Sequence, residues 1–219
     1  MKIPRKPLAL LSLFILLVVG CAGQNEAKNF LPLTPGNLWT YDVNIQGERT
    51  DMQVEVGQPR EVEGKNAIPL SYSYNRLALP TQVEYYVIED NAIVFPRIDN
   101  VQGQYLKKPF QVFLKFPLKP GAKWEWTGNL VTMGDDDKKT RARVRVEVNE
   151  AEKVVTHVAT YQKAVKISFN SVFDANGTDF AIKEDRWYVK GVGMVKEVLY
   201  DETGEEIMVA ILKKLEKKD

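Results

Sequence analysis

The sequence has a single cysteine, Cys21, and a single histidine, His157. One cysteine cannot form an internal disulfide, and one histidine without further cysteines cannot complete a usual zinc site. No serine after residue 20 stands in the G-x-S-x-G pattern that presents the nucleophile of many serine hydrolases. We therefore expect no metal, no cofactor and no catalytic residues, and a fold that is held together by packing alone.

An excess of charge of one sign is also absent. Three of the 30 basic residues precede residue 21, which leaves 27 basic residues against 29 acidic residues in the rest of the chain. Proteins that bind nucleic acid usually carry a strong basic excess. This balance therefore argues against a nucleic-acid partner.

The long apolar run of the chain lies at its N-terminus. Lys2, Arg5 and Lys6 precede the run from residue 8 to residue 20, and this order is typical of a secretory signal. A membrane-spanning helix needs about 20 apolar residues, and no later run approaches that length. We therefore assign residues 1–20 to a signal peptide and leave them out of the fold.

The signal ends at Cys21 instead of at an ordinary A-x-A site. Residues 17–21, LVVGC, resemble the bacterial lipobox, in which the cysteine receives a diacylglyceryl group and its amino group an acyl chain such as palmitate. The resemblance implies a lipoprotein attached to the membrane at Cys21, because two or three acyl chains give stable attachment. Ala22 replaces the aspartate that commonly retains lipoproteins in an inner membrane, so we expect the outer membrane, facing the periplasm, in a cell that has two. The alternative is an uncleaved signal anchor.

Residues 22–29, AGQNEAKN, are small and polar. We predict that residues 21–29 form the lipidated cysteine and a short tether. Eight residues span at most about 28 Å, which would keep the domain close to the bilayer.

A corner motif occurs twice in the chain. The pattern P-L-x-P-G-x-x-W covers residues 32–39 and recurs at residues 117–124. Proline fixes φ and glycine permits positive φ, so each Pro-Gly pair is typical of the centre of a type II turn. Each tryptophan then begins an aromatic strand, and we expect it to anchor the core beside the turn. The residues of the two corners are Pro35, Gly36 and Trp39, and Pro120, Gly121 and Trp124.

The repeated corner predicts two β units, residues 30–114 and residues 115–219, within one compact domain. A second similarity, between residues 85–87 (YYV) and residues 187–189 (WYV), favours the same division. Two copies of a repeat indicate a pseudo-symmetric domain and not a solenoid.

Alternation of apolar and polar residues predicts strands along the body of the chain. The apolar residues Ala142, Val144, Val146 and Val148 are separated by charged residues, which is the period of a half-buried strand. We predict an all-β, mainly antiparallel fold with little helix, a two-fold internally repeated sheet sandwich or partly open barrel. Residues 150–161 are a candidate helix, and residues 207–217 alternate and are predicted to be mainly strand.

Two motifs resemble a known group. The corner FLPLTPGNLWTY, its second copy FPLKPGAKWEW and residues 185–196, DRWYVKGVGMVK, resemble bacterial secreted proteins and lipoproteins in which P-L-x-x-G-x-x-W-x-Y is paired with W-Y-x-x-G-V-G-[ML]-V-K. The resemblance covers most of residues 30–200. It implies an all-β fold and no particular activity. The chain has a weaker resemblance to half-barrel lipoprotein carriers of bacterial envelopes. This resemblance rests on the expected architecture and the expected location in the envelope.

Several polar patterns are interpreted as structural. Residues 191–193 (GVG) lack the third glycine of a dinucleotide motif and predict a kink where another backbone comes close. Asp174, Asn176 and Asp179 look calcium-like, but their glycine stands at the wrong position for an EF-hand, so we predict a hairpin turn. Residues 135–137 predict a solvated hairpin tip, with a cation or partner site as the alternative. Glu184 and Asp185 are adjacent strand residues and should point to opposite faces.

One segment carries the candidate ligand site. Between residues 104 and 124 there are five lysines and no acid, interleaved with aromatic residues. A basic aromatic face can contact anionic lipid or an anionic amphiphile. The alternative is a strand with a solvated lysine face. The candidate residues are Lys107, Lys108, Phe113 and Lys115.

Three functional hypotheses are compatible with the sequence. The first is a non-enzymatic binding or scaffold module of the envelope that contacts another protein. The second is a carrier of lipid or another hydrophobic ligand in a half-barrel, which requires a cavity. The third is a hydrolase that uses carboxylates, which requires a cleft with paired acids.

Overall fold

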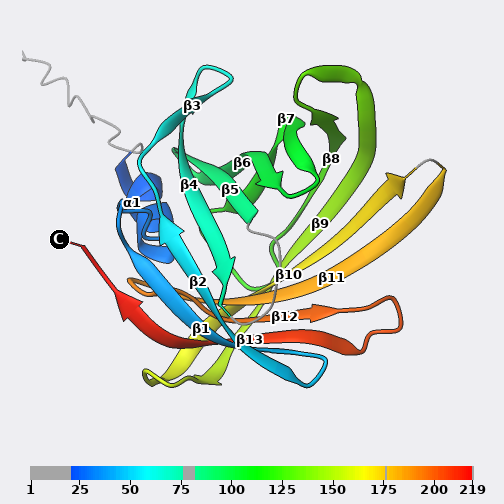
Figure 1. The fold of residues 1–219 in the computed structure, drawn as a ribbon. Coiled ribbons are helices and arrows are strands. Elements are labelled where there is room, and N and C mark those ends of the chain that lie inside the picture. Colours follow the sequence, from blue (N-terminus) through cyan, green and yellow to red (C-terminus); the bar gives the residue numbers. More distant parts are fainter. Residues whose placement is uncertain (1–20, 76–81, 176, 219) are drawn as a thin grey trace, which may run out of the picture.

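The structure of the protein is a computed structural model that describes residues 21–75, 82–175 and 177–218 (Figure 1). The predicted signal peptide lies outside the described residues. Strands make up most of the described chain and α1 is a short helix, which confirms the all-β prediction. The elements are α1 (Cys21–Phe30), β1 (Leu38–Ile45), β2 (Glu48–Val56), β3 (Arg60–Val62), β4 (Lys65–Tyr74), β5 (Gln82–Glu89), β6 (Ala92–Asn100), β7 (Gly103–Lys115), β8 (Lys123–Thr132), β9 (Asp135–Val155), β10 (Thr160–Ala175), β11 (Thr178–Val189), β12 (Gly193–Tyr200) and β13 (Glu206–Glu216).

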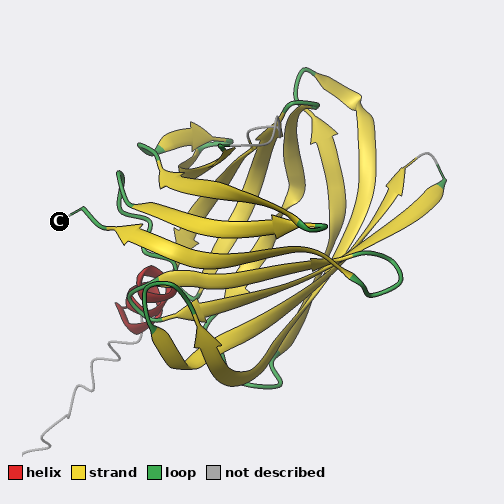
Figure 2. Ribbon diagram, turned by 60° about the horizontal axis from the view of Figure 1, so that its bottom comes forward, coloured by secondary structure: helices red, strands yellow, loops and turns green. Residues whose placement is uncertain are grey.

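The strands form one antiparallel sheet that closes into a barrel (Figure 2). Its order is β2-β1-β13-β12-β11-β10-β9-β8-β7-β6-β5-β4-β3, and β2 also pairs with β4. This additional pairing, from Met52↔Tyr74 to Val56↔Leu70, joins the two edges of the sheet. β3 stays outside the ring and pairs only with β4. Of the two predicted architectures, the sheet sandwich and the partly open barrel, the structure has the barrel, and its ring is closed.

The helix α1 lies against one end of the barrel (Figure 1). Ala27 is fully buried, and the Phe30 ring stacks on the Phe116 ring with centroids 5.9 Å apart. The N–H of Gly191 also donates to the carbonyl of Asn29 at 2.7 Å. The segment that we expected to be a tether is thus helical, and its C-terminal part packs on the barrel. We call this end of the barrel the closed end. The opposite end, which carries the β1–β2, β8–β9 and β10–β11 turns, is called the open end.

Along β9 the residues of the barrel core alternate with polar residues that point outward. Ala142, Val144, Val146 and Val148 are 0–4% exposed, whereas the arginines between them are exposed. Such side chains contribute about 1.5–3 kcal/mol each when they are fully buried. The alternation predicted from the sequence is therefore confirmed for this strand and its inward face.

The helix predicted at residues 150–161 is wrong. β9 continues to Val155, and β10 begins at Thr160 after a turn. The turn is closed by Thr156, whose N–H donates to Ala159 O at 3.0 Å, and β-branched residues at 154–156 favour the extended conformation. The strand predicted at residues 207–217 is confirmed as β13. Among the described residues, no helix has the length and apolar character needed to cross a membrane.

Candidate ligand-binding site in the barrel lumen

The barrel is hollow toward its open end. A cavity of about 330 Å³ is lined by residues of β2, β4 to β7 and β9 to β13, and includes Tyr74, Gln82 and Phe173 near the turns of the open end. Toward the closed end only about 20 Å³ remains between the side chains, because Trp39, Tyr41 and Tyr188 fill the space. The cavity volume is at the lower limit of the sites that take small organic ligands.

Stacked aromatic rings form one wall of the cavity. The ring of Phe113 lies on the ring of Phe169, with centroids 5.1 Å apart and planes 12° from parallel. Tyr86 contacts Phe95 and Phe113 at centroid distances of 5.1 and 5.0 Å. These contacts hold the rings in fixed positions, so the wall offers a flat apolar surface to a ligand.

The carboxylate of Glu84 is held inside the barrel by neutral donors. Its Oε2 accepts hydrogen bonds from the hydroxyls of Tyr72, at 2.7 Å, and Tyr86, at 2.6 Å. Its Oε1 accepts one from the Gln82 amide at 3.0 Å. Burial, and next the charge of Glu84, raise the pKa of both tyrosines well above the ordinary value. Both phenols therefore remain protonated and act as donors.

Arg186 is the centre of a second polar group in the lumen. Its Nε donates to a carboxylate oxygen of Glu184 and lies 2.9 Å from Oε1 of Glu197. Burial alone would lower the pKa of Arg186, but the charge of Glu197 and further acidic groups raise it well above the ordinary value. Burial raises the pKa of Glu197, and the guanidinium opposes that shift. The arginine is thus a fixed cation between two carboxylates.

Lys107 is a third charged group of the lumen, and it is 9% exposed. Its Nζ donates to the side-chain oxygen of Gln111 and lies 3.6 Å from the ring centroid of Phe95 and 5.7 Å from that of Trp126. Among the described residues, no carboxylate oxygen lies within 4.0 Å of Lys107 Nζ, the distance limit for an ion pair. Burial lowers the pKa of Lys107 to about 7, although the charge of Glu84 opposes the shift. Its ammonium is therefore held by an amide and by aromatic faces.

The four residues of the predicted ligand site are divided between the two sides of the barrel wall. Lys107 and Phe113 line the cavity, whereas Lys108 and Lys115 are exposed on the outside. Lys107 and Lys108 are adjacent in β7 and therefore point to opposite faces of the sheet. Lys107, Gln111 and Phe113 share the inward face, although the pairing with β6 shifts between Arg97↔Leu106 and Phe95↔Gln111. The single basic aromatic face that we expected is not formed.

The first predicted corner closes the wall beside α1. Gly36 has φ of +88°, which favours glycine, and its N–H donates to Val56 O at 2.8 Å. The N–H of Val56 donates in return to Asn37 O at 2.9 Å. The turn that begins after Pro35 therefore joins the start of β1 to the end of β2.

The second corner makes the same contacts. Gly121, which follows Pro120, has φ of +81°, and its N–H donates to Val148 O at 2.8 Å. The N–H of Val148 donates to Ala122 O at 2.9 Å. Both corners thus tie their first strand to the following one through a reciprocal pair of hydrogen bonds.

The two motifs of the family resemblance meet inside the barrel. The Trp39 indole donates to Val192 O at 2.7 Å, and the Tyr41 hydroxyl donates to Met194 O at 3.0 Å. Trp39 and Tyr41 are each 2% exposed. In this chain the opening motif therefore anchors the start of β12.

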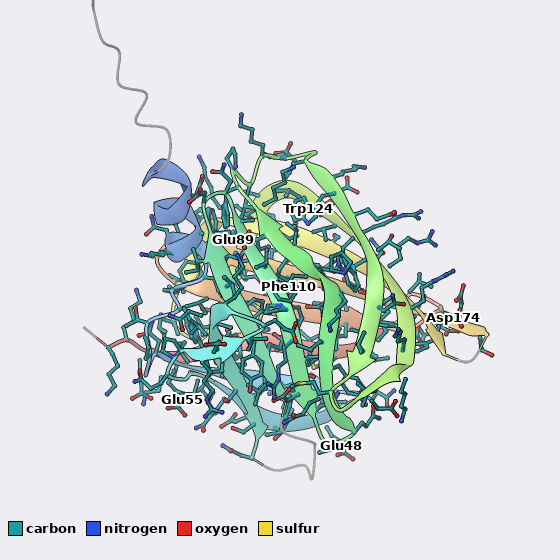
Figure 3. The ribbon with its side chains drawn as sticks, turned by 90° about the horizontal axis from the view of Figure 1, so that it is seen from above. Glu48, Glu55, Glu89, Phe110, Trp124 and Asp174 are labelled. Atoms are coloured by element: carbon teal, nitrogen blue, oxygen red, sulfur yellow. The ribbon has the colours of Figure 1, made fainter. Side chains whose placement is uncertain are left out.

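In the second half of the chain, Trp124 and Trp126 bridge a gap in the barrel wall where β7 and β8 separate. β7 and β8 pair only from Tyr105↔Thr132 to Lys108↔Asn129. Beyond that point the Trp124 indole donates to Val112 O at 3.0 Å and the Trp126 indole to Pro109 O at 2.8 Å. Figure 3 shows Trp124 and Phe110 on the two bordering strands.

Gly128 allows the two strands to approach where this gap begins. A Cβ at this position would lie 2.5 Å from the Trp126 ring and 2.7 Å from the Lys108 carbonyl. A larger residue therefore cannot be accommodated without movement of the wall. The glycine is required here by close approach, since the structure assigns it no positive φ.

The remaining polar candidates have structural surroundings. His157 is half exposed in the β9–β10 turn, with Nε2 3.3 Å from Asp42 Oδ2. Asp174 pairs with Asp179 in the predicted β10–β11 hairpin, while Asn176 lies outside the described residues. Asp185 points away from the lumen that Glu184 lines, and it accepts a hydrogen bond from Ser168. Within the described part of the chain, no group of three potential metal ligands occurs.

Sequence reasoning missed four polar residues of the lumen. A signal was available, because each shares the inward face of its strand with apolar or aromatic residues. Glu84 precedes Tyr86 by two positions, and Arg186 precedes Tyr188 in the same way. The missed residues are Glu84, Gln111, Arg186 and Glu197.

No family model and no curated protein matches this chain. Two solved structures are similar to it. A candidate lipoprotein from Parabacteroides distasonis has a TM-score of 0.58 at 13% identity, over 86% of this chain and 99% of that chain. A candidate exported protein with a YmcC-like fold from Bacteroides fragilis has a TM-score of 0.56 at 16% identity, over 86% of this chain and 99% of that chain. The likeness shows a shared fold, the closed antiparallel barrel.

Proposed function

We propose that this protein is a non-enzymatic, lipid-anchored module of the bacterial cell envelope that holds a small amphiphilic molecule in its barrel. The observation that carries the proposal is the cavity of about 330 Å³, which combines a stacked aromatic wall with charged groups. A barrel filled completely by side chains would have no place for a ligand. The carrier hypothesis therefore becomes the leading one, with a closed barrel in place of a half-barrel.

The proposed location in the envelope rests on the lipobox at Cys21 and on the two solved structures with a similar fold. One neighbour is described as a candidate lipoprotein and the other as a candidate exported protein. α1 begins at Cys21 and lies at the closed end, so a lipid at Cys21 would place that end toward the membrane and turn the open end away from it. We propose the outer membrane in a cell that has two.

The charged groups of the lumen do not favour catalysis. Glu84 is bound by two tyrosines and a glutamine, and Glu184 and Glu197 are bound by Arg186. A general acid or base must be free to exchange its proton with a substrate. We therefore assign these carboxylates to the structure of the site and propose no hydrolase activity.

Native mass spectrometry of the mature, lipidated protein extracted from cells tests the proposal. We expect a small organic adduct that is lost on denaturation. Ser171→Trp places a large ring in the cavity and should abolish the adduct, because Ser171 lines the lumen. Asn170→Trp, at the exposed neighbouring position, is the matched control and should retain it. A wild-type protein without an adduct, or an adduct that survives Ser171→Trp, would contradict the proposal.

A second function, docking of a partner protein at the open end, is favoured by exposed apolar residues. Val101, Met133, Phe180 and Ile182 are 38–72% exposed and belong to the turns or the hairpin of that end. Apolar surface at a rim often marks a contact site. Crosslinking in cells from position 101 should capture the same partner as position 180, and position 158 in the β9–β10 turn at the closed end should not. Equal capture from all three positions would contradict this second function.

A further inference from the structure

The lumen contains one charge that the protein itself leaves without a counter-charge. Lys107 is buried, and within the described residues no carboxylate lies within 4.0 Å of its Nζ. An ammonium group has three donors, and one of them is used by Gln111. A buried cation is costly unless it is paired, so the site is incomplete as the protein alone builds it.

The other charged groups of the lumen are already engaged. Glu84 accepts hydrogen bonds from Tyr72, Tyr86 and Gln82, and Arg186 binds two carboxylates. Glu84 therefore influences Lys107 through its charge without forming an ion pair with it. The titratable groups that face the cavity around Lys107 are Tyr72 and Tyr74 of β4, Glu84 of β5, Glu184 and Arg186 of β11, and Glu197 of β12.

We propose that the ligand of the lumen is an organic anion with a flat apolar body, whose carboxylate or sulfonate group binds the ammonium of Lys107. This inference rests on the proposed function and names the ligand class. The apolar body would lie against the rings of Phe95, Phe113 and Phe169, which line the same cavity. The anion supplies the missing counter-charge through a charge-assisted hydrogen bond, which is stronger than a neutral one.

The inference predicts a defined pH dependence. In the empty barrel the pKa of Lys107 is about 7, so the ammonium loses its proton as the pH rises through that value. A bound anion favours the charged form and raises the pKa of Lys107. Binding must then take up a proton above about pH 7, and the affinity for the anion must fall as the pH increases.

Three ligands of nearly equal shape test the charge requirement by isothermal titration calorimetry of the full mature protein. They are 2-naphthoate, its neutral methyl ester and 2-naphthylmethylammonium. At about pH 6 we expect 2-naphthoate to bind about 10- to 100-fold more tightly than the ester, which is the effect of one hydrogen bond to a charged group. At about pH 8.5 the preference should shrink, because the carboxylate stays ionised and only Lys107 has lost its charge.

Variants at position 107 separate charge from folding. Lys107→Met should remove the preference for 2-naphthoate over the ester. Lys107→Arg should retain the preference and lose its pH dependence, because arginine stays protonated. Lys108→Met, at the exposed neighbouring lysine, is the matched control and should change neither.

The possible outcomes distinguish the two proposals. Equal binding of 2-naphthoate and its ester, or preference for the ammonium ligand, would overturn the anion inference while the cavity remains a binding site. An anion preference that persists in Lys107→Met would overturn it as well. Failure of all three ligands and of the native adduct would instead remove the proposed function.

Discussion

Replacement of Arg186 by methionine is the most informative perturbation of the lumen. The guanidinium side chain is 11% exposed and lies 2.9 Å from a carboxylate of Glu197 that is 6% exposed. The substitution preserves much of the apolar stem and removes the charge. Both carboxylates on Arg186 then lose their donor, and Glu197 is left as an uncompensated buried anion.

The magnitude follows from this geometry. Removal of one partner from a buried ion pair costs about 3–5 kcal/mol, because the other charge stays buried without compensation. We expect Arg186→Met to lower the free energy of unfolding by about that amount at about pH 7.5. A marginally stable domain of about 5–15 kcal/mol would still fold.

The loss should depend on pH, and its sign is fixed. Burial raises the pKa of Glu197 and the arginine opposes this, so the variant carries a still higher folded-state pKa. The folded variant therefore binds more protons than the unfolded chain, and its stability falls as the pH rises above the unfolded value of about 4.3. At about pH 5 the destabilisation should be smaller by at least about 1 kcal/mol, which corresponds to less than one pKa unit.

Urea unfolding followed by tryptophan fluorescence at both pH values measures the effect. The double variant Arg186→Met with Glu197→Met is the control, since replacement of a buried pair by apolar residues is often close to neutral. The double variant should recover most of the wild-type stability, and its stability should depend on pH as that of the wild type does. A loss that is independent of pH, or equal in the single and double variants, would refute the reasoning.

Three further predictions concern the anchor, the wall and the core. Cys21→Ala should release the protein from the membrane fraction or leave it uncleaved, and a mutant that stays in membranes at mature size would contradict the lipoprotein proposal. Gly128→Ala should cost about 1–3 kcal/mol in urea unfolding, because the added methyl overlaps the tryptophan ring and the carbonyl that approach the glycine; Thr127→Ala, at the exposed neighbour, should stay within about 0.5 kcal/mol. Tyr41→Phe should cost about 1–3 kcal/mol, since Met194 O would lose its buried donor, and an unchanged midpoint would show that this hydrogen bond is dispensable.

The fold was predictable wherever it depends on local periodicity. Alternation at residues 142–148 placed the valines inward, and the Pro-Gly pairs placed both corner turns correctly. These signals depend on neighbouring residues, so no tertiary information is needed. The prediction failed at residues 150–161, where polar and charged residues of an exposed strand end carry no alternation that distinguishes strand from helix.

The candidate site was predictable only in part. Lys107 and Phe113 were expected to contact a ligand, but they were grouped with Lys108 and Lys115, which lie outside. Adjacent strand residues point to opposite faces, so Lys107 and Lys108 cannot share one face. Which face of β7 lines the lumen depends on how the sheet closes, and the pattern of one strand does not report that closure.

The sequence by itself determined the all-β class, the strands with clear alternation, the corner turns and the expected address at Cys21. The tertiary structure decided that the sheet closes, through pairings such as Met52↔Tyr74 and Leu38↔Glu216. It also decided that charged residues from four strands, β5, β7, β11 and β12, meet in one lumen. Local patterns fix the direction of each side chain, whereas closure and convergence depend on contacts between residues that are far apart in the chain.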